Sequence, residues 1–335
     1  MLKNFPYIEI SGDAHERGLQ HGSQLKERIH ANIAFYKKII KASEEDLLLK
    51  VKHFQKIIQG FNYEYAIEID AIAEGASVDP VWVYMINARS ELIDHFNECT
   101  SFFFKESSLL AQNWDWAETS ENLVVVMRVT NENGNTFIHL TEPGMLGKIG
   151  FNDKGIGVCL NFLASSKPLL GIPVHILLRS VLDSQTFEEA KDTIKTHAQN
   201  TAGNLLIADA EGSYVNFEMS GEHIFEYDSD TSVVCHTNHF HMQDNKDPDK
   251  FANSMQRFKR ANYLASNIQK FSIDEAKNIL ADKEDKASAL CRVYHKNETI
   301  GNVGTIVSIV MDLSNKTLHI TDGNPHENDY AMVRL

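Results

Sequence analysis

Glu98-Cys99-Thr100-Ser101-Phe102-Phe103-Phe104 is followed, after a short polar turn, by Leu109-Leu110-Ala111-Gln112-Asn113-Trp114-Asp115-Trp116. Two runs of apolar and aromatic residues around such a turn predict a β-hairpin. The hairpin brings Asp115 back towards Cys99, so the thiol gains a carboxylate neighbour. Each residue also has an ordinary structural interpretation, because a buried cysteine packs as a small hydrophobe and a buried aspartate accepts hydrogen bonds.

The N-terminal part of the chain has the periodicity of helices. Apolar side chains recur at helical spacing along residues 14–41. Ser43, with Asp46 three residues later, predicts the start of a second helix. Further on, we expect Gly75 at a helix end and Pro80 at a helix start.

From residue 99 onward, strand-like runs joined by tight turns replace the helical pattern. Turn sequences lie at residues 133–134, 153–155, 211–212 and 314–316, each between two apolar runs. Helices are expected after Pro173, Thr186 and Ser272 and over residues 249–269. The pattern predicts an α+β protein in which a helical N-terminal segment, residues 1–98, precedes a segment, residues 99–335, of two sheets between helix layers.

The composition is that of an ordinary globular protein, with 335 residues, 43% of them hydrophobic and 23% charged. The net charge of -14 argues against nucleic acid and anionic membrane surfaces as partners. We see neither a signal peptide nor an apolar run that approaches the roughly 18 residues of a membrane span. Four scattered cysteines without a Cys-x-x-Cys pair predict no disulfide framework, so the cytoplasm is the expected location.

The sequence around Cys99 resembles the acyl-coenzyme A:6-aminopenicillanic-acid acyltransferase family. That family belongs to the N-terminal-nucleophile (Ntn) hydrolases, beside the choloylglycine and penicillin V hydrolases. The centre of the match is Cys99-Thr100-Ser101 followed by Gln112-Asn113-Trp114-Asp115. Similar segments follow the family order at residues 17–22, 154–161, 236–240, 254–257, 305–313 and 323–325.

The resemblance implies an αββα sandwich that cuts itself between Glu98 and Cys99. The family pattern has glycine before the cysteine, where this sequence has Glu98. Cleavage would expose an α-amino group with a reference pKa of about 7.7–8.0, which can accept the thiol proton. The roles that the resemblance implies are Cys99 as nucleophile, Asp115 as holder of its amine, Asn161 and Asn238 as oxyanion donors, and Arg257 as a brace for the cysteine or its partner carboxylate. From the residues alone, an asparagine at a strand end is a turn residue and Arg257 is a solvated helix charge.

The implied function is hydrolysis or transfer of an acyl group through a thioester on Cys99, without a cofactor. The expected substrate is a small-molecule acyl amide or an acyl-coenzyme A-like compound. Segments 1–98 and 99–335 would stay associated after cleavage, and a homo-oligomer is left open. Two alternatives are an uncleaved, non-catalytic relative that binds a small ligand and a metallohydrolase that uses His236, His239 and His241. The histidines lack an evident further ligand at zinc-site spacing, so no metal site is predicted.

Overall fold

The computed structural model describes residues 2, 4–93, 99–165, 169–229, 231–243, 248–268, 270–284 and 289–335. The strands are β1 (Tyr7–Gly12), β2 (Cys99–Phe104), β3 (Leu109–Ala117), β4 (Val125–Asn131), β5 (Thr136–Thr141), β6 (Ile149–Asn152), β7 (Gly157–Asn161), β8 (Ala202–Ala208), β9 (Tyr214–Ser220), β10 (Ile224–Tyr227), β11 (Val233–His236), β12 (His295–Asn297), β13 (Gly301–Asp312), β14 (Thr317–Thr321) and β15 (Tyr330–Arg334). The first sheet has the order β1-β4-β5-β6-β7-β8-β9-β10. The second has the order β11-β2-β3-β13-β14-β15, with β12 paired to β13.

Helices precede, connect and cover these sheets. They are α1 (Ala14–Gln24), α2 (Lys26–Ile39), α3 (Glu44–Phe61), α4 (Tyr63–Ala76), α5 (Pro80–Asn87), α6 (Arg89–Leu92), α7 (Val174–Asp183), α8 (Phe187–His197), α9 (Ala252–Ser266) and α10 (Ile273–Leu280), with short 3₁₀ helices at Lys105–Ser107, Glu118–Leu123 and Pro248–Phe251. Within the described ranges, none of them has the length and apolarity needed to cross a bilayer.

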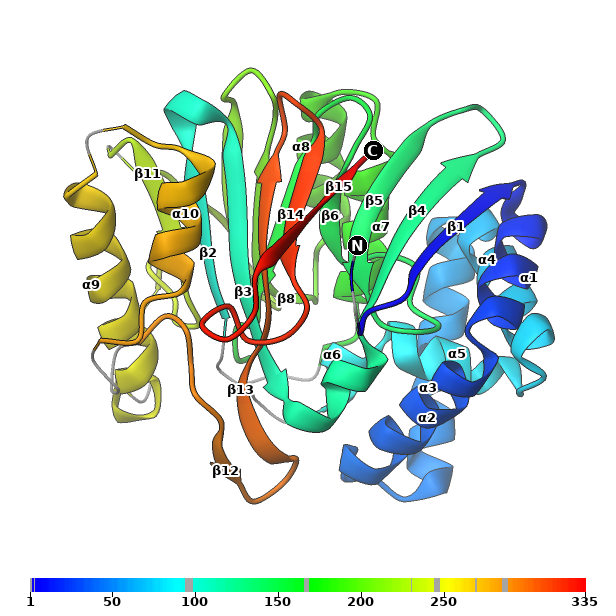
Figure 1. Ribbon diagram of the computed structural model, residues 1–335. Coiled ribbons are helices and arrows are strands. Elements are labelled where there is room, and N and C mark those ends of the chain that lie inside the picture. Colours follow the sequence, from blue (N-terminus) through cyan, green and yellow to red (C-terminus); the bar gives the residue numbers. More distant parts are fainter. Residues whose placement is uncertain are drawn as a thin grey trace.

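The layers follow the αββα arrangement expected from the sequence. Figure 1 shows the two sheets stacked in the centre of the molecule, with α9 and α10 beside the second sheet. Helices α7 and α8 pack on the other side, against the first sheet. Helices α1–α5 gather beside β1 and β4, at one edge of the first sheet.

The predicted hairpin is β2–β3, and its side chains alternate between two cores. Phe102 and Phe104 pack with Ala261 of α9 and Ile279 of α10. Phe103 belongs to the larger core between the sheets. All three phenylalanines are almost completely buried, so both faces of β2 are covered, which explains why its second half, Phe102–Phe104, is a continuous apolar run rather than an alternating one.

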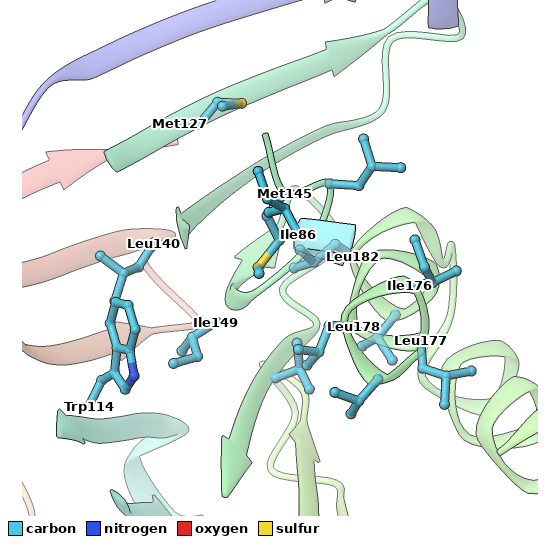
Figure 2. Packing of buried hydrophobic residues seen from close by; sticks show 14 of the residues in the cluster. Ile86, Trp114, Met127, Leu140, Met145, Ile149, Ile176, Leu177, Leu178 and Leu182 are labelled. Carbon is cyan, nitrogen blue, oxygen red and sulfur yellow. The ribbon is translucent and has the colours of Figure 1, made fainter. Parts of the chain in front are cut away.

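The larger apolar cluster includes residues between the two sheets and residues under α7, which covers the first sheet. Figure 2 shows Ile176, Leu177, Leu178 and Leu182 on α7, and Trp114 of β3 in the same cluster. Burial of a side chain of this size contributes about 1.5–3 kcal/mol. Trp114, the neighbour of Asp115 on β3, is therefore anchored in the interior of the sandwich.

One expectation for the N-terminal segment was wrong. Residues 7–12 form β1, which pairs in parallel with β4, although we expected helices throughout residues 1–98. Gly75 lies near a helix end as expected, one residue before α4 ends at Ala76, and Ser77 caps the helix in the left-handed region. Packing also favours glycine at this position, since an added Cβ at Gly75 would lie 2.7 Å from Leu19 O of α1.

The close contact of α1 with α4 predicts an unequal effect of two glycine substitutions. An added Cβ at Gly22 would lie 2.2 Å from Ile72 O, whereas one at Gly60 in α3 has no neighbour within 4 Å. Gly22→Ala should therefore lower the free energy of unfolding by about 1–3 kcal/mol. Gly60→Ala should raise it by about 0.4–1 kcal/mol, because alanine restricts the unfolded chain. Urea unfolding followed by circular dichroism measures both, and equal effects would contradict the packing argument.

Candidate active site

Cys99 begins β2 and lies directly opposite Trp114 of β3. Its side chain is buried, with 9% of the residue exposed. Its backbone N–H donates to Asn238 Oδ1 at 2.8 Å, and its carbonyl oxygen accepts from Arg257 Nη1 at 2.7 Å. The backbone N–H and C=O of Cys99 are therefore both bound by side chains that the sequence analysis named as site residues.

Arg257 is a buried structural cation and not a solvated helix charge. It lies on α9 and is completely buried. Besides the Cys99 carbonyl, it donates to Thr100 Oγ1 at 2.9 Å and to Asn238 Oδ1 at 2.8 Å. Its Nε donates to Asn253 Oδ1 at 2.9 Å. One guanidinium group thus connects α9, the start of β2 and the segment after β11.

Asn238 lies in the turn that follows β11, and its orientation is set by neighbours on three sides. Its backbone N–H donates to Ser254 Oγ at 2.7 Å, and its Nδ2 donates to Phe162 O at 3.0 Å. Because Oδ1 accepts from Cys99 and Arg257, the amide flip is determined. The donor atom Nδ2 therefore points away from Arg257, towards the chain after β7.

Glu218 of β9 holds the segment that carries Asn238 at both ends. Its Oε1 lies 2.8 Å from His236 Nε2 and accepts from the His241 backbone N–H at 2.8 Å. Its Oε2 accepts from the Met242 backbone N–H at 2.9 Å. Burial raises the pKa of the Glu218 carboxyl, but its bonds to His236 and the two backbone N–H groups outweigh burial and lower that pKa overall. An ionised carboxylate therefore ties the turn to the first sheet.

Asp115 is next to Trp114 on β3 and is almost completely buried. Its Oδ1 accepts from Thr305 Oγ1 of β13 at 2.6 Å. The register between β3 and β13 shifts just after Thr305. Asp115 and Cys99 line one cavity, so the hairpin brings the carboxylate and the thiol together as predicted.

Asn161, like Asn238 and Arg257, is not among the described residues that line the cavity of Cys99. Its Oδ1 accepts from Ser101 Oγ at 2.6 Å, and its Nδ2 donates to His236 O at 3.4 Å. It therefore links β7 to β2 and β11 across the two sheets. Its role as an oxyanion donor stays a prediction.

The Cys99 side chain lines a small cavity of about 40 Å³. Trp114, Trp116, Ile149, Leu160 and Phe162 form its apolar wall, and Arg89, Gln112, Asp115 and Lys148 contribute its long polar side chains. Burial, reinforced by the Asp115 carboxylate, raises the pKa of the Cys99 thiol to about 12. The protonated thiol is therefore favoured at neutral pH, and a thiolate forms only where a base takes its proton.

A buried ion cluster that sequence reasoning missed borders this cavity. Glu142 accepts from Arg89 Nε at 2.9 Å and from Lys148 Nζ at 2.7 Å, and it also bonds to the Tyr36 hydroxyl. Lys148 Nζ lies 3.0 Å from the centroid of the Trp114 ring. One feature of the sequence could have indicated this cluster. Glu142 and Lys148 are the two charged residues in the short connection between β5 and β6, which is otherwise uncharged.

A larger cavity of about 420 Å³ lies elsewhere, among α1, α4, α7 and α8. Its lining contains none of the five predicted site residues. We place the candidate site at the smaller cavity, because Cys99 and Asp115 line it.

The three histidines of the metal alternative do not form one ligand group. Among the described residues, the group close enough to hold a metal ion is Glu218, His236 and His241, whose ligand atoms lie within 4.8 Å of one another. His239 Nδ1 instead lies 2.8 Å from Ser254 Oγ. Glu218 is already engaged by a histidine and two backbone N–H groups, which is what a structural clamp requires.

The structure describes the predicted cleavage site only on its C-terminal side. Cys99 is placed as above, whereas Glu98 lies outside the described residues.

Comparison with known proteins bears out the resemblance seen in the sequence. The family model described as "Acyl-coenzyme A:6-aminopenicillanic acid acyl-transferase" matches residues 104–327. The chain is also 26% identical over 344 residues to the acyl-coenzyme A:6-aminopenicillanic-acid-acyltransferase 40 kDa form of Emericella nidulans. That alignment covers 98% of this chain and 95% of the relative.

Solved structures with a similar chain path include two amide-hydrolysing enzymes. An N-acylethanolamine-hydrolyzing acid amidase ortholog from Caenorhabditis elegans has a TM-score of 0.46 and 18% identity, over 64% of this chain and 93% of its own. Penicillin V acylase from Agrobacterium tumefaciens has a TM-score of 0.39 and 13% identity, over 71% of this chain and 86% of its own.

The contacts of Glu218 with His236, His241 and Met242 form a clamp on the segment that carries Asn238. We therefore expect the free energy of unfolding to depend strongly on this carboxylate. Glu218→Ala leaves two backbone N–H groups and His236 without their buried acceptor, which should cost about 3 kcal/mol or more. Glu226→Ala on the adjacent β10 is the control, because Glu226 pairs with Lys191 and Lys195 at the surface and should change stability little. Chemical unfolding of the two variants tests this, and a Glu218 variant as stable as the control would rule out the clamp.

Proposed function

Because the chain belongs to the acyl-coenzyme A:6-aminopenicillanic acid acyl-transferase family, we propose that it is a self-cleaving cysteine enzyme that acts on a small-molecule amide. Cys99 is the nucleophile, and the acyl group passes through a thioester on its sulfur. The substrate is an acyl amide or an acyl-coenzyme A-like compound, as the name of the Emericella relative suggests.

The observation that carries this proposal is the way in which the backbone of Cys99 is held. Asn238 binds its nitrogen and Arg257 its carbonyl oxygen, while its side chain lines the cavity. Such an arrangement suits a residue whose nitrogen becomes a free amine, because Asn238 Oδ1 can then accept a hydrogen bond from that amine and orient it. In a strand, the neighbouring strand can supply both partners, whereas here side chains supply them.

Self-cleavage changes the acid–base chemistry of the site. The nitrogen of Cys99 is an amide before cleavage and an amine afterwards, with a reference pKa of about 7.7–8.0. A neutral amine accepts the thiol proton directly or through a water molecule. Asp115 favours the protonated amine that results, because the carboxylate lies on the neighbouring strand.

The reaction then follows the usual course of nucleophilic acyl transfer. The thiolate attacks the substrate carbonyl carbon, and Asn238 Nδ2 donates to the oxyanion that forms. Removal of such a donor typically costs about 10²–10³ in rate. Collapse of the tetrahedral intermediate gives the thioester and expels the amine, which takes its proton from the ammonium of Cys99. Water or a second amine completes the cycle.

Buried charges favour the continued association of segments 1–98 and 99–335 after cleavage. Glu68 of α4 forms ion pairs with Arg17 of α1 and with Arg179 of α7, on opposite sides of the cleavage site. Glu142 is paired in the same way with Arg89 of α6. Separation of the segments would leave these buried charges without partners, which is strongly unfavourable.

The first test is the mass of the purified protein. The proposal predicts two fragments, residues 1–98 and a larger one that begins at Cys99, whereas Cys99→Ala should remain one chain of 37.9 kDa. Cys159→Ala is the control, because this thiol is buried in β7 outside the proposed machinery, and it should cleave like the wild type. Incubation with a panel of acyl amides should add the acyl mass to the larger fragment only. A wild-type chain that stays whole, or turnover by Cys99→Ala, would falsify the proposal.

The second test concerns the association of the fragments at low pH. Burial alone raises the pKa of Glu68, but the guanidinium groups of Arg179 and Arg17 outweigh burial and lower it to about 2. A carboxyl whose pKa is lower in the folded state stabilises that state above its unfolded pKa of about 4.3, and the contribution is lost as pH falls towards 2. The fragments should co-elute in size-exclusion chromatography at pH 7 and separate in that acidic range. Glu68→Gln should separate at a higher pH than the wild type.

A further inference from the structure

The ion cluster beside Cys99 contains one more positive than negative group. Glu142 is the shared carboxylate of Arg89 and Lys148, and its partner Tyr36 is a neutral phenol. Arg89 and Lys148 both line the cavity of Cys99, whereas Glu142 lies behind them. The Asp115 carboxylate also lines the cavity, but Arg89 and Lys148 share the single carboxylate of Glu142. Burial of a cation is costly, so one of the two cations is expected to give up its proton more readily than in water. A guanidinium does not do so, which leaves Lys148.

The proposed function leaves the first step without a base. In the uncut chain the nitrogen of Cys99 is an amide that donates to Asn238, so it cannot accept the thiol proton. The thiol itself is protonated, as its pKa of about 12 requires. Self-cleavage therefore needs a proton acceptor that the mature enzyme does not need.

Among the described residues that line the cavity, Asp115 and Lys148 are the two side chains that can accept a proton. Asp115 Oδ1 already accepts a hydrogen bond from Thr305 Oγ1 of β13. Lys148 Nζ lies over the ring of Trp114, the residue directly opposite Cys99 in the hairpin. The cavity of about 40 Å³ has room for a water molecule that connects the amine and the thiol.

We propose, on the basis of the function proposed above, that neutral Lys148 is the general base for self-cleavage and takes the thiol proton of Cys99 directly or through one water molecule. The proton moves from Sγ to Nζ, and the thiolate attacks the carbonyl carbon of residue 98. The bond from that carbon to the Cys99 nitrogen then breaks, and the nitrogen receives the proton from Nζ. Water hydrolyses the resulting thioester, which restores the thiol and leaves a free carboxylate on residue 98.

The charges around Lys148 agree with this role. Burial, aided by Arg89, lowers the pKa of Lys148 to about 7, although Glu142 and Cys99 act in the opposite direction. His139 and His175 also face the cluster, and burial lowers the pKa of each well below the usual value. Asp115 is the remaining charged group of the cavity. Burial and Arg89 therefore favour the neutral amine of Lys148, and burial favours the neutral form of both histidines.

Two substitutions of Lys148 distinguish a role as a base from a role as a positive charge. Lys148→Met leaves Arg89 and Glu142 as a balanced pair, so the variant should fold, which circular dichroism checks. Lys148→Arg keeps the charge but has no accessible neutral form. Lys154→Met, on the turn between β6 and β7, is the surface control. Cleavage of freshly made chains is followed by intact mass spectrometry between pH 5 and pH 9.

We expect Lys148→Met and Lys148→Arg both to cleave at least about 100-fold more slowly than the wild type, and Lys154→Met to cleave normally. Wild-type cleavage should quicken as pH rises through about 7, because the neutral amine is the active form, and Lys148→Met should lose that rise. Cleavage by Lys148→Arg at the wild-type rate would overturn the base role, since charge alone would then suffice.

A second measurement does not depend on cleavage. In Cys99→Ala, which cannot cut itself, the ¹³Cε resonance of Lys148 should titrate near pH 7. A midpoint near the reference value of about 10.4 would rule out the base role. A wild-type chain that never cleaves would overturn the proposed function together with this role, whereas normal cleavage by Lys148→Met would overturn the role of Lys148 alone.

Discussion

The carboxamide oxygen of Asn238 accepts one hydrogen bond from the backbone of Cys99 and one from the guanidinium group of Arg257, and the geometry of the site depends on this junction. It connects the first residue of β2, the turn after β11 and helix α9. Because both donors point at one oxygen, the nitrogen of the same amide is left to face the chain after β7. The packing of α9 against the second sheet is thus also what aims the side chain of Asn238.

A second constraint is the placement of charge in the interior. Glu68 and Glu142 are each paired with cations from both sides of residue 98. Such pairs contribute little net stability relative to an apolar core, but they are costly to break. They therefore suit a chain whose backbone is cut while its packing is kept. The cluster around Glu142 also holds Lys148 at the wall of the cavity. The same carboxylate therefore pairs with Arg89 across the proposed cleavage site and positions the proposed base.

Local signals predicted the elements that depend on neighbouring residues. The hairpin from Cys99 to Asp115 and the turns at Gly134 and Gly155 follow from residues that are close in sequence, and a positive φ at both glycines explains the residue type. Strand β1 was missed because its partner β4 lies more than a hundred residues away. Asn161 was matched by motif, but its contacts with Ser101 and His236 depend on how the two sheets face each other.

The sequence by itself determined the class of the fold, the hairpin that places Asp115 beside Cys99, and the family to which the chain belongs. These follow from periodicity, turn residues and ordered motifs, all of which are local or cumulative along the chain. Only the tertiary structure decided which charges are buried and what they contact. Without the family resemblance, which implied that Arg257 braces the cysteine, Arg257 is interpreted as a solvated helix charge, and the sequence did not single out Lys148. Burial and ion pairing depend on segments that are distant in sequence, and desolvation, rather than residue type, determines whether a lysine is a surface cation or a base.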